Sequence, residues 1–121
     1  MADLVLPHKH GEEEDIEKLK NNLSKEDRFA LVSSIFDQLS DPTRIRIFWL
    51  LCHYEECVMN ISSIMDMSSP AISHHLRALK SSGLIISRRE GKEVYYRVAD
   101  TPECRLLHSM IEEVMEIKCP V

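Results

Sequence analysis

The chain has 121 residues, of which 44% are hydrophobic and 29% charged, a mixture typical of one globular domain with its own core. No apolar run approaches the roughly 20 residues of a membrane-spanning helix, and the start turns acidic at "GEEED", unlike a secretory signal. We therefore expect a cytoplasmic protein with no membrane partner, in which the four cysteines are reduced thiols.

The charge is distributed unevenly along the chain. The total is −5, but residues 68–97 contain six basic and two acidic side chains, a net +4 that leaves −9 for the remainder. A concentrated basic segment suits a nucleic-acid partner even on an acidic chain. The chain has only three glycines, too few to favour a glycine-rich phosphate-binding loop, and it shows no nucleophile–base set. We therefore expect that the protein is not an enzyme.

The predicted elements are helix, helix, helix, helix, strand, strand and helix. Residues 1–23 are polar and are expected to form a flexible N-terminal arm with some helix near its end, while 24–121 form the domain. Apolar residues at helical spacing predict a helix in "DRFALVSSIFDQL". Asp41 as N-cap, with Pro42 at the first helical position, predicts the start of the next helix, "PTRIRIFWLLC".

The following segment predicts two helices and a hairpin. A short helix is expected in "VMNISSIM", with Ile61, Ile64 and Met65 facing inward. After "DMSSP", a helix is expected over 69–82 and is ended by Gly83. The β-rich runs "LIISRR" and "EVYYRV" flank "EGK", which predicts a hairpin.

A short helix, a turn, a second helix and a basic hairpin form the winged helix-turn-helix arrangement, a mainly α fold with a small β-hairpin. An α-helix fits the major groove of DNA, and a cationic hairpin tip can reach phosphates or the minor groove. The predicted partner is therefore double-stranded DNA.

Two adjacent histidines lie on the helix over 69–82. At about 100° per residue, His74 and Arg77 project away from the predicted apolar stripe, while His75 lies at its margin. We expect His74 to face DNA and His75 to be hydrogen-bonded within the protein; because neighbouring side chains diverge, the pair is a poor metal site. The stripe consists of Ile72, Leu76 and Leu79. The residues expected to contact DNA are Ser68, Ser69, Ser73, His74, Arg77, Lys80, Arg88, Arg89 and Lys92. The serines among them also suit helix capping.

Four stretches carry a family resemblance: "LSDPTRIRIFWLLC", "EECVMNISSIM", "SSPAISHHLRALKSSGLI" and "SRREGKEVYYRVAD". They cover most of residues 39–100 and resemble the ArsR/SmtB family of metal-sensing repressors, with "SHHLRALKSSGLI" and the cysteine region most similar to its CadC branch. The family implies a homodimer built from the first and last helices, which leaves its operator when an inducer binds. The last helix, expected over about 102–118, has a long apolar stripe that fits a dimer seam.

The resemblance also implies an inducer site. Members with a thiol-rich site carry "CVC" followed by Asp, where this chain has "CVMN" beginning at Cys57. Their N-terminal arm supplies two further ligands, and His8 and His10 occupy that region here. These three residues are a candidate site for Zn²⁺ or Cd²⁺, with Pb²⁺ and As(III) as further candidate inducers. The alternative is a buried Cys57 beside an idle arm.

A second family site combines Asp-x-His of one subunit with His-x-x-Glu of the other. In this chain Asp100 and Glu116 match, whereas Pro102 and Glu113 replace the two imidazoles. The remaining carboxylates, Asp100, Glu113 and Glu116, form an all-oxygen set that suits weak binding of Mn²⁺ or Ca²⁺, or no metal.

Other triggers remain open on the same fold. Cys104 and His108 are one helical turn apart, a spacing that can bind a metal or activate a thiol. A repressor could therefore respond to thiol oxidation or persulfide through Cys104 and Cys119, or have no inducer. A winged helix that binds another protein is a further alternative.

Overall fold

The structure, a computed structural model, describes residues 5–10 and 13–117. It divides the chain into two units, Met1–Ser34 and Ile35–Val121. Within the first unit, helix α1 (Glu13–Leu23) is the helix expected near the end of the N-terminal arm. None of the described helices is long and apolar enough to cross a membrane.

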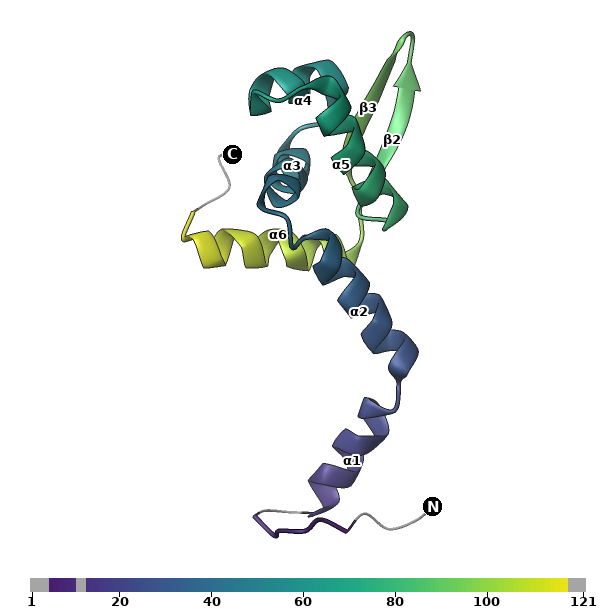
Figure 1. Ribbon diagram of the computed structural model, residues 1–121, viewed down its shortest axis with the longest axis vertical. Helices are drawn as coiled ribbons and strands as arrows, with labels where there is room; N and C mark the ends of the chain where they lie inside the picture. Colours follow the sequence, from purple (N-terminus) through teal and green to yellow (C-terminus); the bar gives the residue numbers. More distant parts are fainter. Residues whose placement is uncertain (1–4, 11–12, 118–121) are drawn as a thin grey trace. The chain divides into compact units, whose positions relative to one another are not determined.

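Helix α2 (Glu26–Gln38) begins in the first unit and ends in the second. The elements that follow are α3 (Pro42–His53), β1 (Glu56–Cys57), α4 (Val58–Met65), α5 (Ser69–Ser81), β2 (Ile85–Glu90), β3 (Glu93–Val98) and α6 (Pro102–Met115). Figure 1 shows α5 beside the β2–β3 hairpin, with α3 on the other side of α5 and α6 running below them. The predicted winged helix-turn-helix order is confirmed.

The hairpin belongs to a three-stranded antiparallel sheet with strand order β1-β3-β2. Glu90 is opposite Glu93, so Gly91 and Lys92 form the turn, and Gly91 takes the left-handed backbone (φ 61°) that glycine adopts without strain. Strand β1, which pairs Cys57 with Tyr95, was not expected. Two residues are too few to show the alternating pattern by which a strand is recognised in sequence.

Both ends of α5 are fixed by local hydrogen bonds. The Ser68 hydroxyl accepts from the backbone N–H of Ala71 at 3.3 Å and caps the N-terminus. At the other end Gly83 has φ 79°, and the backbone N–H of Leu84 donates to the carbonyl of Leu79 at 3.0 Å. This is a Schellman motif, so Gly83 ends the helix as predicted.

The core lies where α3, α4, α5 and α6 meet the sheet. The predicted buried stripe of α5 is confirmed, since Ile72, Leu76 and Leu79 are all buried. On α4, Ile61 and Met65 are buried, but Ile64 is 56% exposed, so its predicted inward orientation was wrong. A helix of 8 residues buries only a narrow face here, and Ile64 lies on the flank of that face.

Helix α6 ends three residues earlier than the predicted limit of 118. Glu116 adopts the left-handed conformation (φ 57°), and the backbone N–H of Ile117 donates to the carbonyl of Glu112 at 3.0 Å, which closes the helix. Leu107 and Ile111 are buried against the core, whereas several apolar side chains on the other face are exposed. These are Leu106, Met110, Val114 and Met115.

Candidate nucleic-acid interface

The outer face of α5 presents the side chains that the sequence predicts for DNA contact. His74, Arg77 and Lys80 are exposed; His74 and Arg77 project away from the buried stripe of the helix, and Lys80 lies on its flank. His75 is half-buried, and its Nδ1 accepts a hydrogen bond from Nε of Arg44 in α3 at 3.3 Å. The expected intramolecular hydrogen bond of His75 is therefore confirmed. The outward direction of His74 is confirmed too, and its contact with DNA stays a prediction.

The hydrogen bond from Arg44 also fixes the protonation state of His75. Because Nδ1 accepts, the imidazole is neutral and carries its proton on Nε2. Burial lowers the pKa of His75, and the Arg44 guanidinium lowers it further, against the opposing effect of the Asp41 carboxylate.

The serines at the start of α5 differ in what they already bind. Ser68 is the N-cap, so its hydroxyl is engaged with the backbone of the helix. The Ser69 hydroxyl lies 3.7 Å from the sulfur of Met59, and Ser73 is half-buried on the helix. Contact between these three hydroxyls and DNA remains a prediction.

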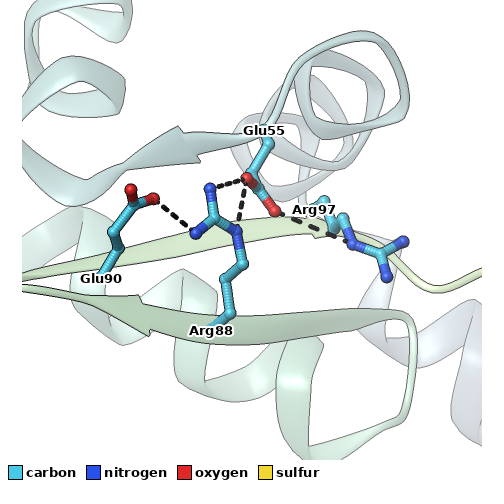
Figure 2. Close-up of polar contacts among 4 residues, drawn as sticks. All are labelled: Glu55, Arg88, Glu90 and Arg97. Atoms are coloured by element: carbon cyan, nitrogen blue, oxygen red, sulfur yellow. Dashed lines mark hydrogen bonds and ion pairs between the residues drawn. The ribbon is translucent and has the colours of Figure 1, made fainter.

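The hairpin arginines are not equally available to a phosphate. Figure 2 shows Arg88 between two carboxylates: its Nε donates to Oε1 of Glu55 at 2.8 Å and its Nη1 to Oε2 of Glu90 at 2.6 Å. Nε of Arg97 lies 3.8 Å from the other Glu55 oxygen. Hydrogen bonding from Arg88 lowers the pKa of Glu55, and the same bond raises the pKa of Arg88.

Glu55 was missed in the sequence, because nothing in "HYEEC" indicates that this acid meets a strand 33 residues later. Its carboxylate offsets the charge of Arg88 within β2. Arg89 and Lys92 are exposed near the turn, where Arg89 Nε donates to the carbonyl of Gly91 at 3.5 Å. The tip is thus the more available source of positive charge.

The candidate soft-metal ligands have contrasting surroundings. Cys57 is buried, at the junction of β1 and α4, and is the N-cap residue of α4 without a side-chain capping bond. The amide of Asn60 donates to Oε2 of Glu56 at 2.8 Å. In the first unit, the rings of His8 and His10 are stacked, with centroids 5.7 Å apart.

The carboxylates of the second candidate site do not come together within the described part of one chain. Asp100 pairs with Nη1 of Arg105 at 2.6 Å, and Glu113 and Glu116 are exposed at the end of α6. A site that divides these ligands between two subunits stays a prediction.

The cysteines proposed for a redox response are placed only in part. Cys104 is buried, and its thiol donates to the carbonyl of Leu84 at 3.5 Å. Cys119 lies outside the described residues.

Comparisons with known proteins agree with this fold. The family described as "Bacterial regulatory protein, arsR family" matches residues 41–87. The chain is 31% identical over 103 residues to the transcriptional repressor SmtB homolog of Synechocystis. This match covers 85% of this chain and 78% of that protein. The chain belongs to the arsR family of bacterial regulatory proteins. The predicted resemblance is therefore confirmed.

Two further relatives of this arsR-family protein are informative. It is 38% identical over 89 residues to a cadmium resistance transcriptional regulatory protein CadC homolog of Staphylococcus aureus, a match that covers 73% of each chain. A solved structure from Mycobacterium bovis superposes with a TM-score of 0.69 at 32% identity, covering 76% of this chain and 84% of that one. That structure is the homodimeric winged helix-turn-helix DNA-binding domain of a possible ArsR-family transcriptional regulator. Fold and family together identify a DNA-binding transcriptional regulator of the ArsR/SmtB type.

Proposed function

We propose that this arsR-family protein is a cytoplasmic, dimeric repressor that leaves its operator when it binds a soft metal or metalloid ion. The observation that carries the proposal is the exposed face of α5, with His74, Arg77 and Lys80, on the same unit as the cationic hairpin tip. On a chain with a net charge of −5, this is where positive charge is concentrated.

In this proposal α5 enters the major groove and the hairpin follows the neighbouring backbone. His74 and Arg77 point farthest from the core and are the candidates for base edges. The other side chains position the protein on phosphates, and each such contact makes binding more sensitive to salt. They are Ser68, Ser69, Ser73, Lys80, Arg88, Arg89 and Lys92.

A second copy of the chain is the proposed partner for the exposed apolar side chains of α2 and α6. Leu106 and Val114 are 71% and 77% exposed, and no residue of α2 is buried. Exposed apolar side chains of this kind mark an interaction site. A twofold dimer would place two copies of α5 about 34 Å apart, which suits a palindromic operator.

For the inducer we propose the ligands that the chain offers for soft ions. Cys57 supplies a thiol, and His8 and His10 supply imidazoles, a combination suited to Zn²⁺ or Cd²⁺ and, through sulfur, to Pb²⁺ or As(III). The cadmium-related name of the Staphylococcus aureus relative supports this choice. A coupling of ~3 kcal/mol between ion and operator would weaken DNA binding about 150-fold.

The other candidate triggers have less support. Asp100, Glu113 and Glu116, shared between subunits, would form a weak oxygen site for Mn²⁺ or Ca²⁺. A thiol-oxidation response through Cys104 requires an accessible thiolate, and the buried Cys104 thiol instead donates a hydrogen bond.

The proposal is tested by fluorescence anisotropy with a palindromic promoter fragment at two salt concentrations. We expect salt-sensitive binding that is lost in the His74→Ala/Arg77→Ala double variant. Arg105→Ala is the matched control, because it removes an exposed arginine from α6 and should bind as the wild type does. Wild-type occupancy in the double variant would overturn the assignment of α5.

The inducer is tested by titrating the complex with Zn²⁺, Cd²⁺, Pb²⁺ and As(III). Release by one of these ions in the wild type, but not in Cys57→Ser, is the expected result. If none of the four ions releases the DNA, the metal-sensing part of the proposal is wrong, and the DNA-binding part still stands.

A further inference from the structure

Helix α3 packs against α6 (Figure 1). Three side chains with metal-binding groups converge at this contact. His53 is the last residue of α3, and His108 and Glu112 are one turn apart on α6. Nε2 of His108 lies 3.3 Å from Oε1 of Glu112, and Nε2 of His53 lies 3.6 Å from Oε2. Ligand atoms of the three residues all lie within 4.8 Å of one another.

These separations are those of ligands around one small cation. Nitrogen and oxygen ligands lie about 2.0–2.2 Å from Zn²⁺, so two ligands in tetrahedral positions are about 3.4 Å apart. The two nitrogen–oxygen distances, 3.3 and 3.6 Å, bracket that value. These two distances run to different oxygens of Glu112, and any ligand atoms that lie as far apart as the 4.8 Å limit would have to move closer together around one ion.

One atom of the cluster lacks a partner of its own. Nε2 of His108 is buried and makes no hydrogen bond among the described residues, because its approach to Glu112 does not have hydrogen-bond geometry. Native proteins rarely leave a buried polar atom unsatisfied. A cation bound between the imidazole and the carboxylate would satisfy this nitrogen.

The surrounding residues support a metal ligand set. Nε1 of Trp49 donates to Oε2 of Glu112 at 3.3 Å, and its ring contacts His53 edge-on, with centroids 4.6 Å apart. Such outer hydrogen bonds hold ligands in place in metal sites. The side chain of His53 is 3% exposed.

We propose that His53, His108 and Glu112 bind a divalent transition-metal ion such as Zn²⁺ in a three-ligand site with an open fourth position. Two imidazoles and one carboxylate are a ligand set that zinc accepts, and nitrogen ligands disfavour Ca²⁺ and Mg²⁺. A cavity of about 280 Å³ beside the cluster is lined by His108 together with Cys52 and Cys104.

This site differs in its residues from both candidate inducer sites. It contains neither Cys57 nor the arm histidines, and none of its ligands belongs to the carboxylate set of Asp100. The inference does not depend on operator binding or on the identity of the inducer. A metal ion bound at this site would link α3 to α6, and α3 in turn contacts α5.

The test is a Co²⁺ titration of the reduced, metal-free, full-length protein, followed by competition with Zn²⁺. The visible absorption bands of Co²⁺ report a site of low coordination number, and a near-ultraviolet thiolate band would appear only if a cysteine is a ligand. The variants are His108→Gln and Glu112→Gln, which keep a polar side chain of similar size. Cys57→Ser and the exposed-histidine variant His74→Ala are controls.

We expect one Co²⁺ per chain, in addition to any ion bound by Cys57, to give visible bands without a thiolate band, and these bands should persist in Cys57→Ser and in His74→Ala. His108→Gln and Glu112→Gln should lose those bands, with circular dichroism confirming that each variant is folded. Trp49→Phe keeps all three ligands and should weaken the affinity about 10–100-fold, as expected for an outer hydrogen bond.

Two results would overturn the site. One is unchanged Co²⁺ binding in folded His108→Gln and Glu112→Gln. The other is the absence of any Co²⁺ or Zn²⁺ bound without thiolate in the wild type. Neither result bears on the operator proposal, which is measured with DNA and with Cys57→Ser.

Discussion

Nε of Arg44 donates to Nδ1 of His75 at 3.3 Å, so α3 is hydrogen-bonded directly to α5, the helix proposed to contact DNA. The same guanidinium donates through Nη1 to the side-chain oxygen of Gln38 at 3.0 Å. Arg44 therefore links the end of α2 to α5, and His75 can accept its hydrogen bond only while the imidazole is neutral.

Acidification should weaken the fold through His75. Burial lowers the pKa of His75 in the folded state, so the unfolded chain binds a proton more readily. The stability contributed by the neutral imidazole is then complete above its ordinary pKa near 6.5 and is lost as the pH falls through the lowered folded value. Between about pH 7 and about pH 5, a range that includes the ordinary pKa of histidine, the urea midpoint should fall less in His75→Gln than in the wild type. An equal fall in both proteins would contradict the prediction.

Removing the carboxylate of Glu55 should strengthen DNA binding. Glu55→Gln releases Arg88 from its closest ion pair and takes a negative charge away from Arg97. We expect several-fold tighter binding to the promoter fragment and a salt dependence steeper by about 0.9 for each phosphate newly contacted. Glu103→Gln, an identical change at an exposed position of α6, is the control and should bind as the wild type does. Weaker binding in Glu55→Gln would show instead that Glu55 orients Arg88 for its contact.

Truncating the buried face of α5 should destabilise the whole domain. Leu76 is 1% exposed, and Leu76→Ala should lower the free energy of unfolding by ~2–5 kcal/mol. Lys80→Ala, on the exposed face of the same helix, should change it by less than ~0.5 kcal/mol. Urea denaturation followed by circular dichroism measures both values, and similar losses in the two variants would be inconsistent with the burial pattern of α5.

Charged residues on α6 should prevent dimerisation without unfolding the chain. Leu106 and Val114 are exposed in a single chain, so Leu106→Asp/Val114→Asp removes little core packing but places charge in the proposed seam. Sedimentation should show a dimer for the wild type and a monomer for the variant. A double variant that still sediments as a dimer would place the seam elsewhere.

The features predicted correctly from sequence are those set by neighbouring residues. Helix α4 coincides with "VMNISSIM", and the end of α5 at Gly83 follows from the backbone freedom of glycine. The buried stripe of α5 and the half-buried position of His75 follow from helical periodicity.

The features that were missed depend on partners distant in sequence. Glu55 pairs with Arg88, which is 33 positions away in the sequence. His53 lies beside residues of a different helix, and helical periodicity cannot predict which helices pack together. The sequence does place Glu112 one turn from His108, but such pairs are common on helix surfaces. Packing of α3 against α6 is needed to show that a second imidazole completes the group.

The two-residue strand β1 has a consequence for engineering. Glu56 and Cys57 pair with Tyr96 and Tyr95 of the hairpin, and α4 starts at the very next residue. A hairpin transplanted from a relative would therefore meet a foreign edge strand. A chimera designed to exchange operator preference should therefore include residues 55–57 together with 85–98. Otherwise the grafted hairpin will be out of register with the strand that leads into α4.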